Sequence, residues 1–307
     1  MKKYYLLLFI ITSLIFVYFF SIKKNTPDRP LIVCSTSIIY DTVMNLISNE
    51  AEVISIMGPG IDPHLYKASA GDAYNIDRAD IIFYNGLHLE GKMADIFESM
   101  KKKNKDIYAI SDAIPEYLLL STEYEKLYDP HIWHDVILWK EVTKYIANIL
   151  IEKYPKKESI IEKNKEIYLE KLDELDFFIK NKLSEIKYSK ILITSHDAFS
   201  YFSKRYGIES YSVQGISTDA EASINDTEKI LKILNENDIP TIFIEQTVCQ
   251  NYLKNIQSIM QLQGKKINIG EKLYSDALGE KGGNTYIQMI KDNVIAITAG
   301  LNNYEMQ

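Results

Sequence analysis

Three histidines in this sequence stand in polar motifs where a metal ion could be held. His64 ends Gly-Ile-Asp-Pro-His, His131 lies within Asp-Pro-His-Ile-Trp, and His196 precedes an aspartate in Ser-His-Asp. Imidazole nitrogens bind zinc and similar divalent ions, and a carboxylate adds charge and a harder donor. Asp276, in Ser-Asp-Ala-Leu-Gly, supplies such a carboxylate. One histidine of this kind is more often a core or capping residue, but three in similar settings, with Asp276, predict a closed four-ligand site.

These motifs require a scaffold that brings their loops together. Short β-rich runs alternate with helical patterns, which predicts βαβ units and a mostly parallel sheet in each half, hence an α/β fold of two lobes. The expected strands are 31–35, 52–57, 81–85, 106–110, 190–194, 209–213, 241–245 and 266–269. The expected helices are 38–48, 70–77, 89–102, 198–206, 226–236, 251–263 and 284–301. Ligands bind such sheets at the carboxyl ends of the strands, so we expect each histidine motif to follow a strand and to open a helix.

One segment between the two halves has a different character. Residues 156–186 contain no Gly or Pro, and their apolar residues keep a helical spacing. A coiled coil would need sustained heptads, which are not clear here, so one long rigid helix joining the lobes is the better interpretation. The predicted division is an N-terminal segment (1–27), an N-terminal lobe (28–155), a connecting helix (156–187) and a C-terminal lobe (188–307).

Composition excludes several classes of protein. The 307 residues carry a formal charge of −7, which repels phosphate backbones and disfavours nucleic-acid binding. Only two cysteines are present, Cys34 and Cys249, so neither a cysteine-based zinc site nor a disulfide framework is expected. Cys34 lies in an apolar run and is predicted to be a buried strand residue with a free thiol.

The first residues indicate a location outside the cytoplasm. Uncharged, mostly apolar residues run from Tyr4 to Ile22 between two pairs of lysines, long enough to span a bilayer. The end of this run lacks a small-residue cleavage pattern, which favours an uncleaved membrane anchor over a cleaved signal peptide. The body is therefore expected outside the cytoplasm, in the periplasm or at the cell surface, or secreted if the segment is cleaved.

The motifs together resemble a known family. The sequence is similar to the zinc/manganese solute-binding proteins of ABC transporters, of the TroA/ZnuA/PsaA type, almost continuously from Leu31 to the C-terminus. The motifs that carry the resemblance are Gly-Ile-Asp-Pro-His-Leu-Tyr at 60–66, Tyr-Asn-Gly-Leu-His-Leu-Glu at 84–90, Asp-Pro-His-Ile-Trp at 129–133, Ser-His-Asp-Ala-Phe-Ser-Tyr-Phe at 195–202, Gln-Gly-Ile-Ser-Thr at 214–218, Phe-Ile-Glu at 243–245 and Ser-Asp-Ala-Leu-Gly at 275–279.

The resemblance implies two α/β lobes bridged by one long helix, with a single metal site at their interface. It assigns metal ligation to His64, His131, His196 and Asp276, and it implies partnership with a membrane permease and its ATPase. Two departures concern the metal. Zinc-specialised members often carry a His-rich loop after the first ligand, yet residues 65–79 contain no histidine, and manganese-specialised members commonly have glutamate where this chain has His196. The sequence is therefore compatible with either Zn²⁺ or Mn²⁺ as the bound metal.

Two other functions have less support in the sequence. A zinc hydrolase needs an open coordination position, which four protein ligands do not leave, and no His-Glu-x-x-His motif is present, so we do not expect an enzyme. A surface adhesin is compatible with an anchored acidic body, but no motif points to one.

Four further residues belong to these motifs or lie next to them. Glu245 and Asp62 are candidate acceptors that orient imidazoles. His88 is expected to be structural or exposed. His134, three residues after His131, is either a substitute ligand or a side chain that packs beside Trp133 or faces solvent, and the second interpretation is favoured because a fourth imidazole would overfill a four-coordinate zinc site.

Overall fold

The computed structural model describes residues 29–122 and 127–303, and the predicted anchor of residues 1–27 lies outside this range. By its internal contacts the chain divides into residues 1–30 and 31–307, and the fold described below is that of the second unit. None of the helices in the described ranges has both the length and the apolar content needed to cross a membrane.

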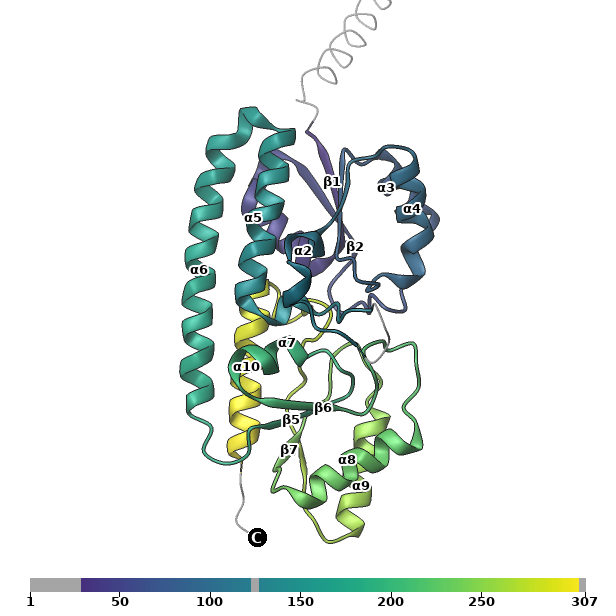
Figure 1. The fold of residues 1–307 in the computed structure, drawn as a ribbon, viewed down its shortest axis with the longest axis vertical. Helices are drawn as coiled ribbons and strands as arrows, with labels where there is room; N and C mark the ends of the chain where they lie inside the picture. The colour runs from purple at the N-terminus through teal and green to yellow at the C-terminus, as the bar shows by residue number, and fades with distance from the viewer. Residues whose placement is uncertain (1–28, 123–126, 304–307) are drawn as a thin grey trace, which may run out of the picture. The chain divides into compact units, whose positions relative to one another are not determined.

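The first lobe is built on a four-stranded parallel sheet in the order β2-β1-β3-β4. Strands β1 and β2 are labelled in Figure 1. Its strands are β1 (Leu31–Thr36), β2 (Glu52–Met57), β3 (Ile81–Tyr84) and β4 (Ile107–Ala109), and its helices are α2 (Ser37–Ile47), α3 (Ala70–Arg78), α4 (Ala94–Lys102) and α5 (Val136–Lys153). Every residue of β1 is buried. Ile32 and Cys34 join one hydrophobic cluster while Leu31 and Val33 join another, as expected for a parallel strand covered on both faces.

The second lobe contains two short parallel pairs. β5 (Ile191–Thr194) pairs with β6 (Glu209–Ser212), and β7 (Thr241–Ile242) pairs with β8 (Asn268–Ile269). The amide of Phe243 donates to the carbonyl of Ile193 at 2.8 Å, which joins the two pairs. The helices of this lobe are α7 (Ser200–Tyr206), α8 (Ile224–Glu236), α9 (Asn251–Leu262) and α10 (Tyr286–Asn302). The predicted α/β class with parallel sheets is therefore confirmed.

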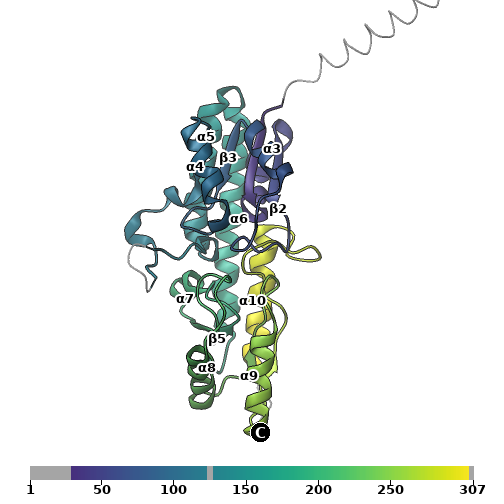
Figure 2. The same ribbon diagram turned by 90° about the vertical axis from the view of Figure 1, so that its right-hand side faces the viewer.

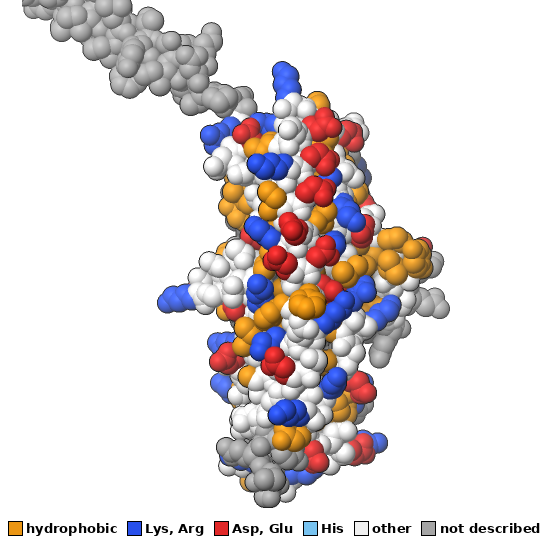
Figure 3. Space-filling model, turned by 90° about the vertical axis from the view of Figure 1, so that its left-hand side faces the viewer, with side chains coloured by type: hydrophobic (Ala, Val, Ile, Leu, Met, Phe, Trp, Pro, Cys, Tyr) orange, Lys and Arg blue, Asp and Glu red, His pale blue; other side chains and the backbone are white. Residues whose placement is uncertain are grey.

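The long connector is a single helix, α6 (Glu158–Ser184), preceded by a 3-10 turn at Pro155–Lys157. Its 27 residues extend about 40 Å at the helical rise. Figures 1 and 2 show α6 running beside α5 of the first lobe and α10 of the second. Its buried side chains form one stripe, and the face seen in Figure 3 carries interspersed acidic and basic side chains. The helix thus buries one side and exposes the other to solvent.

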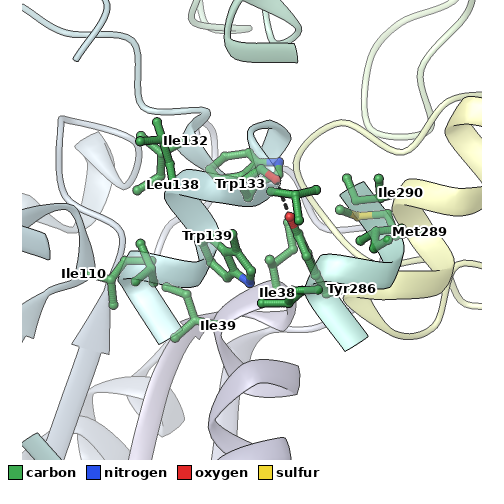
Figure 4. Packing of buried hydrophobic residues seen from close by; sticks show 14 of the residues in the cluster. Ile38, Ile39, Ile110, Ile132, Trp133, Leu138, Trp139, Tyr286, Met289 and Ile290 are labelled. Carbon is green, nitrogen blue, oxygen red and sulfur yellow. Dashed lines mark hydrogen bonds between the residues drawn. The ribbon is translucent and has the colours of Figure 1, made fainter. Parts of the chain in front are cut away.

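The two lobes share a hydrophobic core on the α6 side. The rings of Trp139 in α5 and Tyr286 in α10 stack with centroids 5.2 Å apart, and the Tyr286 hydroxyl donates to the carbonyl of Trp133 at 2.8 Å (Figure 4). One buried cluster continues through α2, α5, α6, α7 and α10. Separating the lobes on this side would expose that core to water, at a cost of about 25 cal/mol per Å² of apolar surface.

Two strands of the second lobe are shorter than predicted. The strand expected at 241–245 ends at Ile242, and the one expected at 266–269 begins only at Asn268. Glu245 instead makes an isolated parallel bridge with Leu273. The predicted state of Cys34 is confirmed: it is buried in β1, and both cysteines are free thiols.

Candidate metal site

The structure brings the four predicted ligands together between the lobes. His64, His131, His196 and Asp276 each offer a donor atom, and these atoms all lie within 4.8 Å of one another. Three of the residues are at most 1% exposed, and His64 is 5% exposed. Buried polar side chains in such a group are costly unless they are hydrogen-bonded or bind a ligand. The arrangement therefore suits a metal ion.

The spacing of the donor atoms fits one small ion. His64 Nε2 lies 3.3 Å from His131 Nε2, and His131 Nε2 lies 3.5 Å from Asp276 Oδ1. His196 Nε2 lies 3.3 Å from the other oxygen of that carboxylate, Oδ2. Bonds of about 2.0–2.1 Å to a tetrahedral zinc ion place its ligand atoms about 3.4 Å apart. The donor set could therefore close around a single ion without large movement.

Two of the histidines are oriented by buried carboxylates. Asp129 Oδ1 lies 2.7 Å from His131 Nδ1, and the carboxylate of Glu245 contacts His196 Nδ1. Glu245 also accepts the backbone amide of His196 at 2.8 Å. A carboxylate at Nδ1 fixes the ring and leaves Nε2 free to bind a metal. The predicted role of Glu245 is consistent with this contact. The sequence analysis assigns no role to Asp129. Its position two residues before His131 could have predicted this contact.

His64 is held differently. Asp62 Oδ1 accepts the backbone amide of His64 at 2.8 Å, while Asp62 Oδ2 accepts the hydroxyl of Thr218 from the second lobe at 2.7 Å. Asp62 was predicted to orient an imidazole, but its hydrogen bond is to the His64 backbone. Among the described residues, the only hydrogen-bond partner of the His64 ring is His131. The ring of His64 is thus the least constrained of the three.

The charged groups of the cluster shift one another's pKa values. Burial lowers the pKa of His64 to about 3, which keeps this imidazole neutral. Burial also opposes the charged form of His196, but the carboxylates of Asp276 and Glu245 outweigh it and raise its pKa well above the ordinary value. The same histidines outweigh the burial of Asp276 and lower the pKa of that carboxyl. Asp276 is therefore an anion, the form in which a carboxylate can bind a metal ion.

The local structure around the ligands differs in part from the prediction. His64 follows β2 and His196 follows β5, as expected. His131, however, follows an isolated bridge between Ser121 and Tyr128, and it precedes a 3-10 turn at Ile132–His134 rather than an α-helix. Helix α5 begins after that turn, where Asp135 accepts the amides of Ile137 and Leu138 as the N-cap. The expectation that all three histidines follow strands and open helices is therefore wrong for His131.

His134 lies outside the donor cluster. Its ring is fully buried, packs on Phe199 with centroids 4.4 Å apart, and places Nε2 3.1 Å from the carbonyl of Ser275. Trp133 Nε1 donates to the same carbonyl at 2.7 Å. The structure therefore gives His134 a packed position near Trp133, not a solvent-facing one. His88 is also outside the cluster, exposed in a turn with φ of +63°, which agrees with the prediction that it is structural or exposed.

The structure has two α/β lobes, one long helix beside both, and a buried group of three imidazoles and one carboxylate between the lobes. Together these features define a class of metal-binding protein. A family model described as "Zinc-uptake complex component A periplasmic" matches residues 32–300, and the chain belongs to this family. It is accordingly a metal-binding substrate-binding component of an ABC transporter, and not an enzyme.

Individual relatives agree in sequence and in structure. The chain is 36% identical to the zinc-binding protein TroA of Treponema pallidum, over 93% of this chain and 94% of TroA. It is 35% identical to the manganese-binding lipoprotein MntA of Bacillus subtilis, over 92% of each. A solved structure of the periplasmic zinc-binding protein TroA from Treponema pallidum superposes with a TM-score of 0.86 at 36% identity, over 89% of this chain and 99% of that one. These matches confirm the fold predicted from the sequence.

Proposed function

We propose that this protein captures one divalent metal ion outside the cytoplasm, through His64, His131, His196 and Asp276, and delivers it to a membrane permease and its ATPase for import. The observation that carries the proposal is the buried cluster of donor atoms, all within 4.8 Å of one another. The relatives named as zinc- and manganese-binding components of transporters support the same function.

Zinc fits the donor set better than manganese does. Three imidazoles and one carboxylate are borderline donors, and the order of intrinsic affinity places Zn²⁺ above Mn²⁺. Three of the distances between donor atoms, 3.3–3.5 Å, are close to the ligand separations of a tetrahedral zinc site, and all the donor atoms lie within 4.8 Å of one another. Zinc is therefore proposed as the tighter ligand, and the relatives include proteins named for each metal.

Residues 1–27 are proposed to remain attached as a membrane anchor that holds the body near the permease. The basis is the apolar run from Tyr4 to Ile22, which is followed by no small-residue cleavage pattern. The rest of the division is proposed as an N-terminal lobe at 28–155, a connecting helix at 156–187 and a C-terminal lobe at 188–307. Membrane fractionation, with N-terminal sequencing of the mature chain, would test whether the segment is retained.

Competition with a chelator of known affinity tests the metal assignment. The purified chain should withdraw one equivalent of zinc and bind manganese more weakly. A chain that binds neither ion, or that binds manganese more tightly than zinc, would contradict the assignment. Enzymatic activity is not expected of this family, so metal binding is the appropriate measurement.

A further inference from the structure

His64 is the ligand nearest to solvent. It is 5% exposed, whereas His131 and His196 are fully buried and Asp276 is 1% exposed. Its neighbours Ile61 and Leu65 are 39% and 44% exposed. An ion that leaves the cluster on this side passes one partly exposed ring, whereas on the α6 side it would have to cross the shared hydrophobic core. Metal exchange is therefore easiest beside His64.

Two contacts join the lobes near His64. The Thr218 hydroxyl donates to Asp62 at 2.7 Å, and Lys92 Nζ lies 2.8 Å from Asp219 Oδ2. Asp62 and Lys92 belong to the first lobe, and Thr218 and Asp219 are adjacent residues of the second. The side chains of Lys92 and Asp219 are 35% and 54% exposed. An ion pair as exposed as Lys92–Asp219 contributes only about 0–1 kcal/mol, so it can open at little cost. The bond between Thr218 and Asp62 is partly buried and is a single hydrogen bond, worth about 1 kcal/mol.

The contacts that surround this opening are firmer. The amide of Gly60 donates to the carbonyl of Leu278 at 2.9 Å, which fixes the base of the loop that carries His64. Deeper in the interface, Leu278 donates its amide to Ser37 Oγ at 3.0 Å, and this bond is buried. Opening at Asp62–Thr218 and Lys92–Asp219 can therefore occur while the rest of the interface stays in place.

We propose that Asp62–Thr218 and Lys92–Asp219 form a latch that positions His64 and controls the rate of metal exchange. The inference rests on the proposed metal-binding function and adds to it the residues that set the rate. Asp62 links the two roles, because one of its oxygens accepts the His64 amide while the other accepts Thr218. Breaking the bond to Thr218 frees the loop that carries the ligand.

The latch predicts a specific kinetic pattern. Its opening assists both uptake and release, so weakening it should raise both rate constants and change the dissociation constant much less. Thr218→Val removes the hydroxyl but keeps the shape, and Lys92→Met removes the charge but keeps most of the stem. Each should raise the zinc release rate by about threefold, and the double variant by about tenfold. Salt near 1 M should reduce the effect of Lys92→Met, because it screens the exposed pair in the wild type.

The experiment is stopped-flow release of zinc from the full chain, in mild detergent, into excess chelator. Thr227→Val and Lys103→Met are matched controls, because the Thr227 hydroxyl donates to the carbonyl of Ser223, the N-cap of its own helix, and Lys103 pairs with Asp77 inside the first lobe. Both controls should release zinc at the wild-type rate. The charge exchange Lys92→Asp with Asp219→Lys should restore slow release.

The outcomes separate the latch from the proposed function. If the wild type binds one zinc ion but the double latch variant releases it within twofold of the wild-type rate, the latch is wrong and metal binding stands. Faster release in the control variants as well would also overturn it, because the effect would not be specific to the two contacts. A wild-type chain that binds no zinc overturns both proposals.

Discussion

The two Asp-Pro-His tripeptides of this chain have the same sequence but hold their histidines differently. In both, the aspartate accepts the backbone amide of the histidine, at 2.8 Å for Asp62 and 2.9 Å for Asp129. Asp129 also contacts the ring of His131 through Nδ1 at 2.7 Å. Asp62 directs its second oxygen to Thr218 in the other lobe instead.

This difference separates a proposed ligand that is held rigidly from a proposed ligand that can adjust its position. His131 is fully buried and oriented by its own tripeptide, so it can act as a permanent part of the site. His64 lies nearer to solvent, and the aspartate beside it holds the lobes together. The same short motif thus provides rigidity on one side of the cluster and access on the other.

Removing a ligand should have the largest effect. Replacement of His131, His64 or Asp276 by alanine should each weaken zinc binding by at least about tenfold, since even the loss of a residue that only orients a ligand costs that much. The loss should be greater for His131 than for His64, because water can reach and replace the more exposed ligand. Chelator competition measures both. Wild-type affinity in any of the three variants would remove that residue from the site.

Changing the two aspartates tests the comparison itself. Asp129→Asn should weaken zinc binding by about tenfold, because the ring of His131 loses its charged partner. Asp62→Asn should change the affinity by less than about threefold, because the amide oxygen can still accept the His64 amide. Asp173→Asn, on the exposed face of α6, serves as the control. Equal losses at Asp62 and Asp129 would contradict the distinction between the two tripeptides.

His134→Leu should have a small effect on zinc and a measurable effect on stability. Among the described residues, His134 Nδ1 is buried without a hydrogen-bond partner, and Trp133 would still donate to the Ser275 carbonyl. We expect one zinc per chain, little change in affinity, and a free energy of unfolding in urea that rises by up to about 1 kcal/mol.

The double variant tests whether His134 can substitute for a ligand. If His131→Ala still binds zinc well but His131→Ala with His134→Leu does not, then His134 replaces the missing imidazole, and its assignment as a packed residue is wrong.

The smallest effect that we expect is the movement of the two lobes relative to each other on metal binding. Helix α6 packs against α5 and α10, and the shared core resists wide separation. Solution scattering with and without zinc should show only a slight change in the radius of gyration. A large decrease in the radius of gyration on adding zinc would contradict the prediction of a rigid connector. It would show that the whole interface between the lobes is flexible, and not the His64 loop alone.

Much of the scaffold could be predicted because its signals are local. The strand at 52–57 has the predicted bounds, and the Gly- and Pro-free run at 156–186 contains the single helix α6. The apolar run of β1 predicted a buried strand, and in the parallel sheet this strand is buried on both faces. These features depend on residue type and periodicity, which a sequence displays directly.

What could not be predicted depends on contacts between distant segments. The bond between Asp62 and Thr218 joins residues 156 positions apart, and no pattern in either segment specifies it. The early end of β7 at Ile242 is similar, because apolar residues continue to Ile244 while the regular pairing with β8 stops and Glu245 pairs with Leu273 instead. Hydrophobicity predicts that a segment is buried but does not specify its hydrogen-bond partners.

A crystal structure of the zinc-loaded chain, with anomalous data collected at the zinc edge, tests the central claim most directly. The account predicts one strong anomalous peak between the lobes, bonded to Nε2 of His64, His131 and His196 and to the carboxylate of Asp276. A zinc ion bound elsewhere, or one that lacks any of these four ligands, would contradict it.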